Sequence, residues 1–198
     1  MVFALSACSA SAMTEDNITK TVALVEKALR EFDRESLQKY VNSKTLNYIL
    51  KLTNNNEQVD TIGKLLFEKL EITVKAVDVE NRQVTVEILN RDMALIGERY
   101  SNMLQHYPND SPLGMLGLLG DEKFLDISVR SLTAQISAAT VPDNPTEVTL
   151  KVSKGAKNLV LYFDEEAEDA VSGGVVTAIS EAFSLTDSGE AEDASKEN

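Results

Sequence analysis

The apolar residues of this chain change their spacing at Glu71, from steps of three and four to steps of two. Upstream, residues 15–32 gather their large apolar side chains on one face of a helix. Downstream, apolar and polar residues alternate through 72–76 and again through 84–88, which predicts two strands joined by a turn at residues 80–82. Helices that precede a hairpin in this way favour an α+β fold.

Other local signals predict more helix before the switch. Asp33 can cap a second helical stretch, and Ser43 can cap its continuation as far as residues 54–56. A third helix is expected over residues 57–69, although Gly63 in its middle costs about 1 kcal/mol relative to alanine. Close packing against a neighbour would explain that glycine.

The first predicted strand contains an irregularity. Val77 and Val79 follow Ala76 on the opposite face of the strand, so its apolar alternation slips by one residue. An extra residue at this point is typical of a β-bulge, which bends the strand. We therefore expect a curved sheet.

The second half of the chain predicts a helical insertion and a second hairpin. Helices are expected at residues 93–107, capped by Asn90 or Asp92, and at 121–138, with a glycine-broken apolar segment at 111–120 between them. Strands follow on either side of a turn at residues 153–158. The continuous apolar run of Leu159 to Phe163 predicts burial on both faces, and the acidic residues 164–169 should open a final helix.

This order predicts N-terminal helices packed on the concave face of a curved antiparallel sheet, with the helical insertion between the two hairpins. Residues 15–185 are long enough to bury one core, so a single α+β domain is expected there. Residues 186–198 contain no apolar side chain larger than alanine. We expect them to form a disordered acidic tail.

Charge and composition exclude several classes of function. The net charge is −13, and residues 164–198 account for −10 of it, with eleven acids against Lys196. Because no basic patch with interleaved aromatics occurs, nucleic acid is not an expected partner. A single cysteine and a single histidine cannot supply an internal disulfide or a four-ligand zinc site. Gly173-Gly174 lacks a phosphate-loop pattern, so no cofactor is expected, and the pair is more typical of a kink or a close backbone contact.

The string Leu5-Ser6-Ala7-Cys8 resembles the processing site of a bacterial lipoprotein signal peptide. The resemblance implies cleavage before Cys8, a diacylglycerol on its thiol, and a translation start upstream of Met1. Residues 1–14 would then be the remnant of the signal peptide and a flexible tether, and the domain would lie at the outer face of the cytoplasmic membrane. The alternative is a buried cysteine in a cytosolic protein, but the Ser and Ala neighbours give it little to pack against.

The order of elements resembles the nuclear-transport-factor-2-like, or cystatin-like, cone. It is similar to uncharacterised extracytoplasmic lipoproteins of Gram-positive bacteria in four features: Val148–Val152, the turn at Gly155, Leu159–Phe163, and the small-residue element 169–175. The resemblance implies a concave apolar pocket.

Two functions of different classes follow. The preferred one is a non-enzymatic lipid-anchored domain that binds a small apolar ligand or a cell-envelope protein through the cone or the exposed apolar segment 113–119. Its candidate residues are Cys8 for lipidation and Leu113, Met115, Leu116, Leu119, Tyr100 and Tyr162 for contact with the ligand or partner.

The alternative is a small isomerase-like or hydrolase-like enzyme that uses the concave pocket. Related cones such as ketosteroid isomerase work with an aspartate base and a tyrosine donor. The candidates would be Asp92 or Asp164 with Tyr100 or Tyr162. The structural interpretation is that Asp92 caps a helix, Asp164 is a negative charge at a helix start, and both tyrosines are amphipathic core residues, so no catalytic residue is expected.

Overall fold

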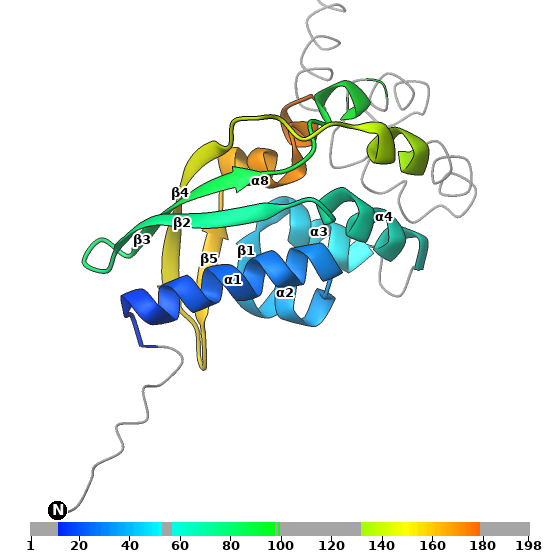
Figure 1. Cartoon of the computed structure of the whole chain (residues 1–198). Helices are drawn as coiled ribbons and strands as arrows, with labels where there is room; N and C mark the ends of the chain where they lie inside the picture. Colours follow the sequence, from blue (N-terminus) through cyan, green and yellow to red (C-terminus); the bar gives the residue numbers. More distant parts are fainter. Residues whose placement is uncertain (1–11, 53–56, 98, 100–131, 179–198) are drawn as a thin grey trace, which may run out of the picture.

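The computed structural model describes residues 12–52, 57–97, 99 and 132–178, in which helices cover one face of a five-stranded sheet (Figure 1). The helices are α1 (Glu15–Glu31), α2 (Arg34–Tyr40), α3 (Lys44–Leu52), α4 (Glu57–Phe67) and α8 (Glu165–Ser172). The strands are β1 (Val41–Ser43), β2 (Glu71–Asp78), β3 (Gln83–Leu89), β4 (Thr146–Lys154) and β5 (Leu159–Phe163), in the spatial order β1-β5-β4-β3-β2. Short helical segments at 94–97 and 132–138 flank the undescribed part of the predicted insertion. None of the described helices is long and apolar enough to cross a membrane.

Both predicted hairpins are confirmed. β2 pairs antiparallel with β3, β4 pairs antiparallel with β5, and β3 joins the two hairpins by pairing with β4. The register between β2 and β3 shifts between Val74 and Ala76, which confirms the predicted bulge.

The prediction of a fully antiparallel sheet is wrong. β1 pairs parallel with β5, with Val41 opposite Leu161 and Ser43 opposite Phe163, so the sheet is mixed. This three-residue strand interrupts the region that we expected to be helical. It is too short to show a period of its own, and its partner lies more than a hundred residues further along the chain.

The prediction that β5 is buried on both faces is also wrong. Leu159, Leu161 and Phe163 are buried, whereas Tyr162 between them is 47% exposed. The described helices pack on one side of the sheet, and Tyr162 points to the other side. The apolar run of residues 159–163 thus predicted a strand correctly, but only one face of that strand is buried.

The core lies between α1 and the inner face of the sheet. The predicted α1 stripe is buried, and Ile18, Val22, Val25 and Leu29 are at most 1% exposed. They belong to one cluster with the inward residues of the strands, among them Val84, Val86, Leu150 and Leu161. These side chains fill the space between α1 and the sheet. The implied concave apolar pocket is therefore occupied by core along this helix.

Local capping signals were read correctly. Asp33 and Asp164 are the N-caps of α2 and α8, and the Ser43 hydroxyl accepts the Leu46 N–H at 2.9 Å at the start of α3. The Ser36 hydroxyl donates to the Asp33 carboxylate at 2.6 Å, and this bond lowers the pKa of Asp33.

An aromatic contact fixes the angle between the N-terminal helices. Phe32 ends α1 in the left-handed conformation, with φ of 50°, and its ring stacks on Phe67 with centroids 6.4 Å apart. The Arg34 guanidinium lies 5.5 Å from the Phe32 centroid and donates to Asp60 at 2.6 and 2.8 Å. A Cβ added at Gly63 would overlap the Phe32 ring. The close packing predicted for Gly63 is confirmed.

Replacing Gly63 with alanine should destabilise the protein, although alanine is the better helix former by about 1 kcal/mol. The new methyl group would overlap the Phe32 ring, and overpacking of this kind costs about 1–3 kcal/mol. Urea unfolding followed by circular dichroism should give a lower midpoint than for the wild type. Lys64→Ala, at the exposed neighbouring position, is the control and should change the midpoint little. An unchanged or raised midpoint for Gly63→Ala would contradict this account of the contact.

Candidate binding groove

The structure describes only some of the residues singled out from the sequence. Tyr162, Asp92 and Asp164 lie within the described part of the chain. Outside it lie the proposed lipidation site Cys8, Tyr100, and the apolar residues Leu113, Met115, Leu116 and Leu119. Their predicted roles remain predictions.

Both candidate bases act as helix caps. The Asp164 carboxylate accepts the Ala167 N–H at 3.1 Å, and the Asp92 carboxylate accepts the Ala94 N–H at 3.2 Å. Tyr162 lies opposite Lys151 of β4 and points away from the core. Tyr162 and the covered face of the sheet are therefore on opposite sides of β5, which does not favour the acid–base pair considered for the concave side.

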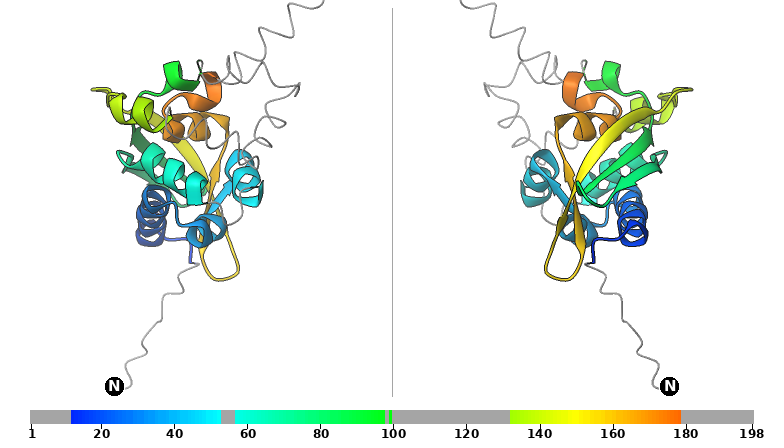
Figure 2. Two further views of the ribbon diagram at one scale, coloured as in Figure 1. Left: turned by 90° about the vertical axis from the view of Figure 1, so that its right-hand side faces the viewer. Right: turned by 90° about the vertical axis from the view of Figure 1, so that its left-hand side faces the viewer.

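A groove of about 510 Å³ opens beside α8, at the end of β3. Three stretches of chain line it: the end of β3 with residues 90–92, residues 142–146, and α8 with the glycines that follow it. Figure 2 shows α8 at the end of the molecule opposite the β4–β5 turn. Spacing within the sequence could not reveal this site, because the three stretches are separated by long segments.

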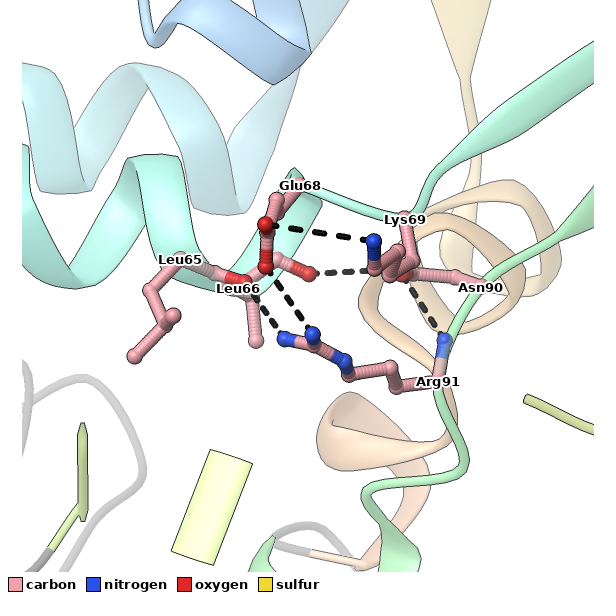
Figure 3. Close-up of polar contacts among 6 residues, drawn as sticks. All are labelled: Leu65, Leu66, Glu68, Lys69, Asn90 and Arg91. Carbon is pink, nitrogen blue, oxygen red and sulfur yellow. Dashed lines mark hydrogen bonds and ion pairs between the residues drawn. The ribbon is translucent and has the colours of Figure 1, made fainter. Parts of the chain in front are cut away.

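Asn90 lines the groove and joins three elements. Its side-chain amide donates to the Leu66 carbonyl oxygen at 3.1 Å, and its Oδ1 accepts the Arg91 N–H at 2.8 Å (Figure 3). The same amide donates to the Val171 carbonyl oxygen at 2.7 Å. Asn90 is only 4% exposed. Because a buried amide that lost these partners would be costly, Asn90 fixes the ends of α4 and α8 against β3. The expectation that Asn90 could cap a helix is wrong, because Asp92 accepts the Ala94 N–H at that helix start.

Arg91 brings a buried positive charge to the same region. Its side chain is 9% exposed, and its guanidinium donates to the Glu68 carboxylate at 2.9 Å and to the Leu65 carbonyl at 3.4 Å. Figure 3 shows this side chain turned towards the end of α4. The charge of Arg91 is thus compensated by Glu68.

The wall of the groove depends on the two glycines that follow α8. Gly173 and Gly174 have φ of +68° and +89°, and a Cβ at Gly173 would overlap the Arg91 carbonyl oxygen. The Met93 N–H donates to the Gly173 carbonyl at 2.7 Å. The close backbone contact predicted for this pair is confirmed.

The acidic string at the start of α8 divides into two kinds of residue. Glu168 accepts hydrogen bonds from the hydroxyls of Ser43 and Thr45 and from the Thr45 N–H, which attaches α8 to the start of α3. Glu165 and Glu166 instead are exposed and line the groove. The sequence predicts an acidic helix start for the whole string. Only the fold separates the hydrogen-bonded Glu168 from the exposed Glu165 and Glu166.

The groove consequently has an acidic lining. The carboxylates of Asp92, Glu165, Glu166 and Asp169 line it, and Asp169 also accepts the Thr177 N–H at 2.7 Å. Within residues 12–52, 57–97 and 132–178, no three His, Cys, Asp or Glu side chains are arranged to hold a metal ion. The chemistry that these side chains offer is attraction of a positively charged group.

Comparison with known proteins found no match to a family model, a curated protein or a solved structure.

Asn90→Asp should destabilise the protein more than Asn90→Ala near neutral pH. The aspartate carboxylate would face the Leu66 and Val171 carbonyls, which both need a donor, whereas alanine only leaves them unpaired, at a cost of about 1–3 kcal/mol. Burial beside carbonyls should raise the pKa of the new carboxyl, so its penalty grows as the pH rises above the unfolded pKa and is lost in acid. Urea unfolding of both variants near neutral pH and in mild acid measures the difference. If Asn90→Asp and Asn90→Ala were equally stable at both pH values, that result would contradict the hydrogen bonds described for Asn90.

Proposed function

We propose that the protein is a non-enzymatic domain, anchored through a lipid on Cys8 at the outer face of the cytoplasmic membrane, that binds a cell-envelope protein through the groove beside α8. The observation that carries the binding proposal is the lining of that groove: exposed carboxylates of Glu165 and Glu166 beside a guanidinium already paired with Glu68. The partner surface that fits such a lining is a segment rich in arginine or lysine.

A protein partner is favoured over a small apolar ligand. Small-molecule sites enclose most of their ligand, whereas this groove is open and is lined by exposed carboxylates. The apolar side of the fold is taken up by the core between α1 and the sheet. Asp92 and Asp164, the two candidate bases, cap helices, which favours binding over acid–base catalysis.

We also propose that the fold is a variant of the cystatin-like, or nuclear-transport-factor-2-like, cone. The support is the path of α1 across one face of a bent sheet whose two hairpins follow the N-terminal helices in the chain. The parallel β1–β5 pair is an addition to that plan.

Lipid attachment predicts that the chain, expressed from its own gene in a Gram-positive host, becomes labelled with an alkyne fatty acid and sediments with membranes. Cys8→Ser should abolish both the label and the sedimentation, because Cys8 is the chain's only thiol. Ser9→Ala, at the adjacent position, is the control and should keep both. Membrane sedimentation of Cys8→Ser would contradict the anchor.

Binding at the groove predicts that neutralising its carboxylates weakens the capture of a basic peptide. Fluorescence anisotropy with a labelled tetra-arginine peptide at low salt should show several-fold weaker binding for Glu165→Gln with Glu166→Gln than for the wild type. The matched control is Glu15→Gln with Asp16→Asn, which removes two exposed acids from the first turn of α1. Equal losses in both double variants would mean that net charge alone attracts the peptide.

A further inference from the structure

The β4–β5 hairpin is basic in a chain that is otherwise acidic. From the start of β4 to the end of β5 the chain contains Lys151, Lys154 and Lys157 against one acid, Glu147, although the net charge of the chain is −13. Lys154 is the last residue of β4 and Lys157 lies in the turn that follows, and both are exposed. The hairpin therefore carries a net positive charge, with two exposed lysines at its turn.

A further lysine, Lys39, is attached to this turn through its backbone. The Asn158 side-chain amide donates to the Lys39 carbonyl at 2.7 Å, which attaches the turn to the end of α2. Lys39 is exposed, and its ammonium lies 5.0 Å from the Tyr40 ring centroid. We refer to Lys39, Lys154 and Lys157 as the lysine cluster.

The lysine cluster and the start of α1 lie at the same end of the molecule. Figures 1 and 2 both place the β4–β5 turn and residues 12–14 at the lower end, with α8 at the opposite end. Thr14 caps α1 and follows Cys8 by six residues. Six residues span at most about 20 Å, so a lipid on Cys8 would hold this end of the domain close to the membrane.

Neighbouring acids only partly offset the cluster. At the start of α1, Asp16 is paired with Lys20 at 2.7 Å. Lys39 belongs to α2, whose first turn contains Glu35. Lys154 and Lys157 instead lie in a stretch, residues 148–163, that contains no acid.

We infer that the lysine cluster lies against anionic lipid headgroups beside the anchor and orients the domain with the groove facing away from the membrane. The inference rests on the proposed lipid anchor at Cys8. Lysines held within about a Debye length, about 8 Å at physiological salt, are attracted to an anionic leaflet. The same field repels the acidic α8 end, so both ends of the domain favour one orientation.

The test uses the full chain coupled through its only cysteine to a maleimide-bearing lipid in vesicles. Vesicles of phosphatidylcholine are compared with vesicles that also contain phosphatidylglycerol, and lysine acetylation is followed residue by residue by mass spectrometry. On the anionic vesicles, Lys154 and Lys157 should be acetylated several-fold more slowly. Lys64, exposed on α4 away from this end, should react equally on both.

Lys154→Glu with Lys157→Glu should remove the protection of Lys39 on anionic vesicles, while Lys64→Glu with Lys69→Glu should preserve it. Equal acetylation of the cluster on the two kinds of vesicle would overturn the inference, as would protection of Lys64 to the same degree. Because chemical coupling replaces cellular acylation, this result is independent of whether cells attach a lipid to Cys8. Failure of the anchor and failure of the orientation are therefore distinguishable.

Discussion

The burial of one helix stripe against one face of the sheet is the interaction on which the other features of this structure depend. Ile18, Val22, Val25 and Leu29 of α1 are almost completely removed from solvent. Burying each such side chain contributes about 1.5–3 kcal/mol, which is large compared with the net stability of a domain. The same packing fills the concave side of the sheet. Binding through the described part of the chain is left to its outer surfaces, the open face of the sheet and the groove beside α8.

Buried polar side chains then fix how the remaining elements meet. Asn90 joins β3 to the ends of α4 and α8, and Glu168 attaches α8 to the segment around Ser43 and Thr45. A buried polar group without a hydrogen-bond partner costs free energy. Packing arrangements that leave Asn90 or Glu168 without partners are therefore less stable than the one observed. The groove follows from these contacts. It is lined by Asn90, which makes these bonds, and by Gly173 and Gly174, the first of which the backbone of Arg91 approaches closely.

Charge divides the molecule along its long direction. The β4–β5 turn and the start of α1 lie at one end, and α8 lies at the other (Figure 1). Exposed Lys154 and Lys157 belong to the end of β4 and to that turn, whereas the first turn of α8 is acidic. A domain with such a separation is oriented by a charged surface even when its total charge is strongly negative. Anchoring at the basic end and recognition at the acidic end are therefore compatible within one small fold.

The sequence by itself determined the features that depend on neighbours along the chain. Apolar periodicity located α1 and both hairpins, the slip of the alternation at Ala76 located the bulge, and Asp33, Ser43 and Asp164 marked helix starts. Only the tertiary structure decided the parallel β1–β5 pair, the exposure of Tyr162, and the groove. Their partners are distant in sequence: Asn90 reaches Val171 over 81 residues, and Ser43 reaches Glu168 over 125. A local pattern records which side chains are apolar or can cap a helix, but a contact between distant segments exists only once the core has brought them together.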